Sequence, residues 1–183
     1  MSHPHDPHLH DLGAPSEWVR RWAHLVRPGG RVLDVACGSG RHARFLAGLG
    51  LRVLGVDRDP TPVDGVPGVE LQVADLEDGS WPLEGERFDG VVVTNYLHRP
   101  LFPRLVEALA PGGVLIYETF ALGNERYGRP SNPDFLLQPN ELLERTRALR
   151  PVAFEQGRIA QPKAAVVQRL CAVREGEWPP ALN

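Results

Sequence analysis

The sequence is short of cysteine, of excess positive charge and of long apolar runs, and each shortage argues against a class of protein. Its two cysteines, Cys37 and Cys171, are too few for the disulfide framework of a small secreted domain. A formal net charge of −3 gives no overall positive field, so nucleic acid is a disfavoured partner. No apolar run reaches the length needed to cross a bilayer. We therefore expect a cytoplasmic protein with no membrane partner.

Length and composition predict one domain preceded by a tail. The 183 residues can bury one substantial core but are few for two. Residues 1–13 hold four histidines among prolines and aspartates, which predicts a disordered tail. Because such a tail offers no fixed outer layer of hydrogen bonds, we expect no specific metal site there. Residues 14–183 are expected to form a single domain.

Short apolar segments alternate with helix-like stripes along the chain. Strand patterns of branched and apolar residues recur at 31–35, 52–56, 69–74, 88–94, 114–118, 152–154 and 164–173. Helical spacing fits segments that start near Ser16, follow Gly40, run over 101–109 and start at Asn140 as an N-cap. Gly157 is expected to turn the last two strands into a hairpin.

This alternation predicts an α/β fold with a mostly parallel sheet. The strand–helix–strand unit over residues 31–57 has a crossover that is right-handed in nearly all parallel sheets. Two segments fall outside the alternation. Prolines in 59–68 predict irregular chain where such folds usually place a helix, and the loop 120–138 is long enough to be a lid or a binding loop.

A glycine-rich turn joins the first strand to its helix, at the edge where open α/β sheets bind ligands. Gly38 and Gly40 let a ligand approach bare backbone, and Ala36 and Ser39 belong to the same turn. The turn alone also fits the loose dinucleotide-binding fingerprint, so an NAD(P)-dependent oxidoreductase is an alternative.

Three aspartates at successive strand ends favour a different cofactor. Asp34 lies close to where a pyrophosphate would sit and would repel it, whereas it attracts the ammonium of S-adenosylmethionine. Asp57, with Arg58 beside it, suits the ribose hydroxyls. Asp75 suits the adenine amino group, and Leu76 packs against the base.

Each of these aspartates could instead cap a turn, as aspartate often does. Caps, however, need no common position at three strand ends around one glycine turn. Together the acids therefore favour the cofactor interpretation.

The motifs resemble those of class I S-adenosylmethionine-dependent methyltransferases, close to the small bacterial tellurite-resistance-type members. The likeness runs from Arg31 to Val173 and is carried by VLDVACGSG at 32–40, VD at 56–57, ADL at 74–76 and LAPGG at 109–113. It implies a Rossmann-like seven-stranded sheet of order 3-2-1-4-5-7-6, with strand seven antiparallel and helices on both faces. Ala36 departs from the pattern, since many members carry glycine there.

Two loops are expected on the methyl-acceptor side. The loop after the fourth strand should border the methyl group, which makes Asn95 and Tyr96 candidate cofactor contacts and His98 a candidate general base. A structural role for His98 is the alternative. In the loop 120–138, Arg126 and Tyr127 suit a small anionic acceptor, unless the loop is simply solvated with its aromatic residues docked onto the domain.

The sequence thus predicts an enzyme that transfers a methyl group from S-adenosylmethionine to a small-molecule acceptor and leaves S-adenosylhomocysteine. A non-catalytic S-adenosylmethionine-binding regulator is a further alternative. RNA stays an alternative acceptor because a predicted helix over 144–150 would present a basic face.

Overall fold

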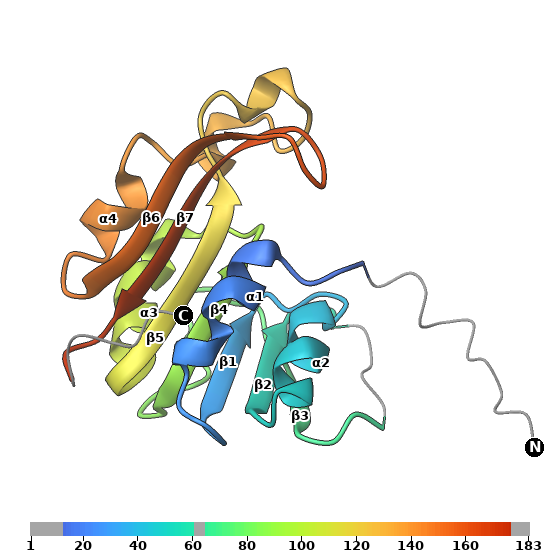
Figure 1. Ribbon diagram of the computed structural model, residues 1–183, viewed down its shortest axis with the longest axis vertical. Helices are drawn as coiled ribbons and strands as arrows, with labels where there is room; N and C mark the ends of the chain where they lie inside the picture. Colours follow the sequence, from blue (N-terminus) through green and yellow to red (C-terminus); the bar gives the residue numbers. More distant parts are fainter. Residues whose placement is uncertain (1–12, 61–64, 177–183) are drawn as a thin grey trace, which may run out of the picture.

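The computed structural model describes residues 13–60 and 65–176, which are organised around one seven-stranded sheet (Figure 1). The strands are β1 Arg31–Val35, β2 Arg52–Asp57, β3 Val69–Val73, β4 Phe88–Thr94, β5 Leu109–Phe120, β6 Arg150–Ile159 and β7 Ala165–Val173. The α-helices are α1 Glu17–Trp22, α2 Arg41–Gly48, α3 Phe102–Ala108 and α4 Glu141–Arg145, and the 3-10 helices are η2 Ala23–Leu25, η3 Arg99–Leu101, η4 Asn124–Arg126 and η5 Pro133–Phe135. The predicted tail, apart from Gly13, and residues 61–64 of the proline-rich segment lie outside the described residues.

The order of the strands is β3-β2-β1-β4-β5-β7-β6, which confirms the predicted topology. Strands β1 to β5 pair in parallel, and β7 is antiparallel to both of its neighbours. Parallel pairing brings the carboxyl ends of β1 to β5 to one edge of the sheet. The loops that carry the predicted site residues leave the sheet at that edge.

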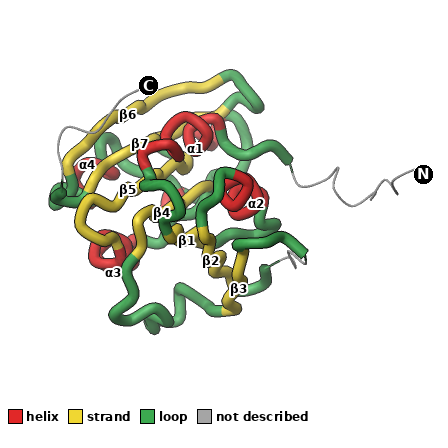
Figure 2. The backbone as a smooth tube through the Cα atoms, turned by 60° about the horizontal axis from the view of Figure 1, so that its bottom comes forward, coloured by secondary structure: helices red, strands yellow, loops and turns green. Residues whose placement is uncertain are grey.

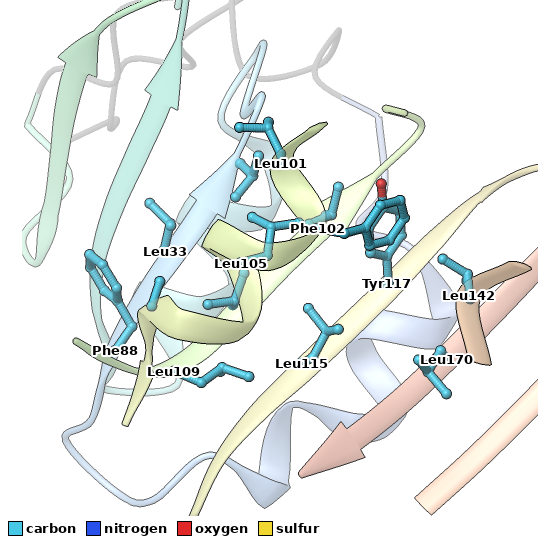
Figure 3. Close-up of a cluster of buried hydrophobic side chains, with 14 of the residues drawn as sticks. Leu33, Phe88, Leu101, Phe102, Leu105, Leu109, Leu115, Tyr117, Leu142 and Leu170 are labelled. Carbon is cyan, nitrogen blue, oxygen red and sulfur yellow. The ribbon is translucent and has the colours of Figure 1, made fainter. Parts of the chain in front are cut away.

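Helices cover both faces of the sheet and divide the core into two layers (Figure 2). Because successive strand residues point to opposite faces, Leu33 packs on the side of α3 and α4, whereas Val32 packs on the side of α1 and α2. In the first layer the rings of Phe102 and Tyr117 stack with centroids 5.5 Å apart (Figure 3). Burial of these apolar side chains is the main force that holds the helices on the sheet.

The first helix packs against β5, and the chain just after η2 lies close against β4. Ser16 is its N-cap, and the Ser16 hydroxyl accepts a hydrogen bond from the Trp18 amide at 3.1 Å. A Cβ at Gly90 of β4 would lie 2.9 Å from a methyl group of Val26, so only glycine permits this approach.

The final hairpin turns later than predicted. Gly157 lies inside β6, opposite Val167 of β7, and the turn falls at residues 160–164. The prediction was wrong because a strand tolerates a single glycine where pairing with a long partner continues on both sides of it.

The helix after Asn140 is shorter than predicted. Asn140 has a left-handed φ of 61° and its side chain makes no cap hydrogen bond. The helix ends at Arg145, because the buried Thr146 hydroxyl donates back to the Leu142 carbonyl at 2.7 Å and the chain then turns to bury Leu149. Residues 144–150 therefore form no continuous basic helix, which removes the ground for an RNA-facing helix there.

Candidate active site

Strand β1 carries a buried carboxylate near its end. Asp34 lies between Gly55 and Val92 of the neighbouring strands and is 1% exposed. Its Oδ2 has no hydrogen-bond partner within the described part of the chain. Burial raises the pKa of Asp34 to about 7, against the opposing effects of the Ala43 backbone and Arg41.

An unpartnered carboxylate oxygen in the core costs free energy, so such an atom is suited to a cation brought by a ligand. The ammonium of S-adenosylmethionine is a cation of this kind. The chemistry of Asp34 therefore fits the cofactor that the sequence predicts.

The turn after β1 contains three left-handed residues. Ala36, Gly38 and Gly40 have φ angles of 52°, 51° and 72°, a region that residues with a Cβ rarely adopt. The Gly38 amide donates to Asp57 Oδ2 at 2.9 Å and so ties the turn to the end of β2. The departure at Ala36 thus costs backbone strain but removes no ligand side chain.

A pocket of about 210 Å³, which we call the Asp75 pocket, lies at the ends of β2, β3 and β4. It brings together many of the predicted cofactor residues, namely Ala36, Asp57, Arg58, Asp75, Leu76 and Tyr96. Ala74 and Glu77 complete the lining, whereas Asp34, Asn95 and residues 38–40 are not part of it. Acids from two strand ends and a glycine-turn residue thus meet in one concave space.

Asp57 and Asp75 also cap turns. The Oδ1 atoms of these residues accept hydrogen bonds from the Asp59 and Glu77 amides, each at 2.9 Å. Since a carboxylate offers about four lone-pair sites, capping a turn and binding a ligand are compatible. The two interpretations weighed from the sequence are therefore not exclusive.

The loop after β4 is held in place by β5. The Asn95 amide donates to the Glu118 carbonyl at 2.9 Å, with Asn95 in a left-handed conformation. The Tyr117 hydroxyl donates to the Tyr96 carbonyl, also at 2.9 Å. Burial, followed by the negative charge of Glu77, raises the pKa of Tyr96, so its hydroxyl stays protonated at neutral pH.

A second pocket of about 200 Å³, which we call the Phe135 pocket, adjoins the first. Its lining comes from the loops that follow β3 and β4, from the end of β5 and from the long loop, and comprises Glu77, Asn95, Tyr96, Leu97, Thr119, Phe120, Pro130 and Phe135. Glu77 and Tyr96 line both pockets and form the wall between them.

The predicted general base His98 and the predicted acceptor residues Arg126 and Tyr127 line neither pocket, and the same is true of Asp34 and residues 38–40. His98 is partly buried at the start of η3, and Arg126 is exposed. Tyr127 is partly buried, with the Arg158 guanidinium 5.9 Å from its ring centroid. Tyr127 is therefore an aromatic residue of the long loop that packs against the domain. The functional roles predicted for His98, Arg126 and Tyr127 stay predictions.

One arginine holds the loop that closes the Phe135 pocket. The Arg99 guanidinium makes a two-point ion pair with Glu141, at 2.7 and 3.0 Å. It also donates to the carbonyls of Asp134 and Leu136, on either side of Phe135. Burial acts to raise the pKa of Glu141, but the hydrogen bond from Arg99 helps to hold it below its usual value. The position of Phe135 therefore depends on Arg99.

A neutral histidine anchors the chain before α1 at the same sheet edge. His42 Nε2 accepts a hydrogen bond from the Ser16 amide at 3.0 Å, so Nδ1 carries the proton and faces Thr94 Oγ1 at 3.3 Å. Burial, followed by the charge of Arg41, lowers the pKa of His42 to about 4. The Ser16 hydroxyl also donates to Glu118 at 2.8 Å. The chain before α1 is thus fixed over the ends of β4 and β5.

The sequence reasoning missed several lining residues. Glu77 stands two positions after Asp75, so the strand end that indicated Asp75 could have indicated it too. Phe120 and Pro130 were missed because they reach the pocket only when the long loop folds back, with Ala121 bridged to Leu137. No local pattern encodes that contact.

Across residues 13–60 and 65–176, no three His, Cys, Asp or Glu side chains are grouped so that they could hold a metal ion. In the same ranges, no helix is long and apolar enough to cross a membrane.

Comparison with known protein sequences reveals a family match and distant relatives. A family model described as a methyltransferase domain matches residues 32–113. A tRNA U34 carboxymethyltransferase of Methylococcus capsulatus is 31% identical over 196 aligned positions, which cover 90% of this chain and 58% of that protein. The chain spans about half the length of the curated relatives it matches.

Solved structures share the fold. TehB from Haemophilus influenzae has a TM-score of 0.72 at 18% identity, over 88% of this chain and 63% of that one. The 1,6-didemethyltoxoflavin-N1-methyltransferase of Burkholderia thailandensis, solved with S-adenosylhomocysteine, has a TM-score of 0.65 at 24% identity, over 86% and 76%. The matched proteins include one named for a tRNA and one named for a small molecule, so the fold does not specify the acceptor.

Proposed function

We propose that the chain is a class I S-adenosylmethionine-dependent methyltransferase and that it transfers the methyl group of this cofactor to a small-molecule acceptor, which the match to a methyltransferase domain over residues 32–113 supports. The observation that carries the proposal is Asp34, whose buried Oδ2 finds no partner among residues 13–60 and 65–176 and lies at the same sheet edge as the Asp75 pocket. When bound, S-adenosylmethionine supplies a methyl group already activated on a sulfonium.

The residues of the chain then have to bind, orient and exclude water. Asp34 holds the ammonium, Asp57 accepts hydrogen bonds from the ribose, and Asp75 accepts one from the adenine amino group. Leu76 packs against the base, and Asn95 and Tyr96 border the methyl group. The loops at this sheet edge would align the acceptor with the sulfonium methyl group, and His98 would take the proton that the acceptor loses as S-adenosylhomocysteine is released.

The Phe135 pocket supports a small acceptor. Its volume of about 200 Å³ suits one small molecule, and it adjoins the Asp75 pocket through the shared Glu77 and Tyr96. The net charge of −3 gives no overall field for RNA, although a relative is named for tRNA. The cytoplasm stays the predicted location, on the sequence ground of two cysteines.

Calorimetric titration with S-adenosylmethionine, S-adenosylhomocysteine and NADH tests the cofactor. We expect heat of binding from the first two and none from NADH. Binding of NADH alone would replace the proposal with an oxidoreductase. Tight binding of S-adenosylmethionine with no transfer to any member of an acceptor library, RNA included, would favour a regulator.

His98 is the proposed general base, and Arg126 and Tyr127 are the proposed acceptor contacts. His98→Ala should lower turnover and leave cofactor affinity nearly unchanged. An Arg126→Ala variant with a raised acceptor KM and unchanged cofactor binding would support an anionic acceptor held by the long loop. Unchanged kinetics in either variant would remove the role proposed for that residue.

A further inference from the structure

The lining of the Phe135 pocket carries a single charge, the carboxylate of Glu77. Glu77 and Tyr96 stand together at the wall between the two pockets, where burial and the negative charge of Glu77 raise the pKa of Tyr96 and keep its hydroxyl protonated. The cations of the long loop, Arg126 and Arg129, are not part of the lining. Glu77 is exposed, so water and salt screen its carboxylate in part, but within contact distance its charge still favours a cation over an anion.

Much of the remaining lining is apolar and flat. Phe120 and Phe135 contribute two aromatic rings, with Leu97 and Pro130 beside them. Phe135 is 51% exposed, so part of its ring is left for another surface to cover. An aromatic ligand would gain both apolar burial and ring contact there.

Phe135 is held at the pocket by the backbone on both of its sides. The Arg99 guanidinium binds the Asp134 carbonyl at 2.6 Å and the Leu136 carbonyl at 2.9 Å, and these contacts fix the segment that carries the ring. Such anchoring lowers the ordering cost that binding would otherwise incur.

We propose that the Phe135 pocket takes a small aromatic acceptor that is uncharged or positively charged, with its ring against Phe120 and Phe135 and its polar end toward Glu77. This proposal rests on the proposed function and names the acceptor class of that function. It opposes the small anionic acceptor that Arg126 suggests from the sequence.

The test compares three ligands of matched size that differ in charge: 2-phenylethylamine, 2-phenylethanol and phenylacetate. Binding is measured by ligand-observed NMR titration with S-adenosylhomocysteine present and absent. We expect the amine to bind about tenfold more tightly than phenylacetate, with the alcohol between them. Equal or tighter binding of phenylacetate overturns the proposal.

Two substitutions assign the preference to this pocket. Glu77→Gln should reduce the difference between amine and phenylacetate to about twofold. Phe135→Ala should weaken all three ligands by a similar factor, about fivefold, and keep their order. The controls are Glu70→Gln, an exposed carboxylate on β3, and Leu49→Ala, which is 53% exposed on the C-terminal side of α2. A tenfold preference that survives Glu77→Gln, or a loss equally large in the controls, contradicts the proposal.

The titrations with S-adenosylhomocysteine distinguish failure of the proposed methyl transfer from failure of the proposed acceptor class. If S-adenosylhomocysteine fails to bind, the proposed methyl transfer fails, whatever the three ligands do. If it binds while the ligands show the reverse charge order, the acceptor class alone is wrong.

Discussion

Asp34 keeps a carboxylate in the core, its Oδ2 unpartnered by any residue that the structure describes, and burial raises the pKa of Asp34 to about 7. The same desolvation that disfavours the charge in the free protein strengthens its attraction to a ligand cation. The buried charge of Asp34 therefore lowers the stability of the free protein but would raise the affinity for a cationic ligand.

Asp34→Asn should lower the affinity for S-adenosylmethionine by roughly 10- to 100-fold, because hydrogen bonds to a charged group contribute about 1.5–3 kcal/mol. Isothermal titration calorimetry above pH 7 measures the change. Asp78→Asn, which alters an exposed carboxylate in the turn before Ser80, is the matched control and should bind normally. Unaltered affinity in Asp34→Asn would dissociate this residue from the cofactor.

Ala36 adopts a backbone conformation that glycine adopts with less strain. Ala36→Gly should therefore raise the free energy of unfolding by about 0.5–1 kcal/mol, after the entropy cost of glycine is subtracted from the strain relieved. Ala47→Gly in α2 is the control and should lower it by about 1 kcal/mol. Urea denaturation gives both values, and destabilisation by Ala36→Gly would show that the left-handed turn carries no strain.

The clustering of many of the proposed cofactor residues could be predicted from the sequence, because these residues stand next to recognisable strands. Asp57, Asp75 and Leu76 meet in one pocket, since parallel strands bring their ends together. The opposite side could not be predicted in the same way. Phe120 and Phe135 are fifteen positions apart in the chain and meet only through folding of the loop between them.

The loop 121–140 is held in place by a side chain from outside the loop. Arg99 lies in η3, outside the loop, yet it joins Glu141 to the backbone around Phe135. Glu141 is 4% exposed, so removing the guanidinium would leave part of a buried charge uncompensated.

Arg99→Gln should release the loop while leaving the Asp75 pocket intact. We expect faster proteolysis within 121–140 and an acceptor KM raised about tenfold, with S-adenosylhomocysteine affinity within about twofold of the wild type. Arg104→Gln, whose ion pairs on α3 are exposed, is the control and should change neither quantity. Equal proteolysis in the two variants would indicate that Arg99 does not hold the loop.

The ranges of strands and helices could be predicted where apolar residues mark them locally, and less well where contacts between distant segments decide where an element ends. Strands such as β1 and β4 match their predicted ranges because continuous apolar character marks buried parallel strands. The hairpin turn and the end of α4 differ because pairing with β7 and burial of Thr146 and Leu149 outweigh local signals.

Two buried groups give the whole molecule opposing responses to pH. The pKa of Asp34 is raised from 3.8 to about 7, so between these values the folded state keeps a proton that the unfolded state has lost, and stability falls as pH rises. The pKa of His42 is lowered from 6.5 to about 4, so in that window the unfolded state binds the extra proton, and stability falls as pH falls. The two contributions nearly cancel from about pH 4 to 6.5.

Asp34→Asn should expose the contribution of His42. The free energy of unfolding of this variant, relative to the wild type, should increase with pH by about 1.4 kcal/mol per unit from about pH 4 to 7 and then level off. His42→Gln should give a relative change of the opposite sign that is complete by about pH 6.5. Urea denaturation at successive pH values measures both, and parallel curves for all three proteins would show that neither group is perturbed by burial.

The wall between the two pockets, Glu77 and Tyr96, makes the occupants of the two pockets interdependent. If a nucleoside moves either side chain, the affinity for the neighbouring molecule changes by some factor, and thermodynamic reciprocity requires the same factor in the other direction. Bound S-adenosylhomocysteine would thus change the affinity for the methylated product, and the product would change the affinity for S-adenosylhomocysteine by the same factor.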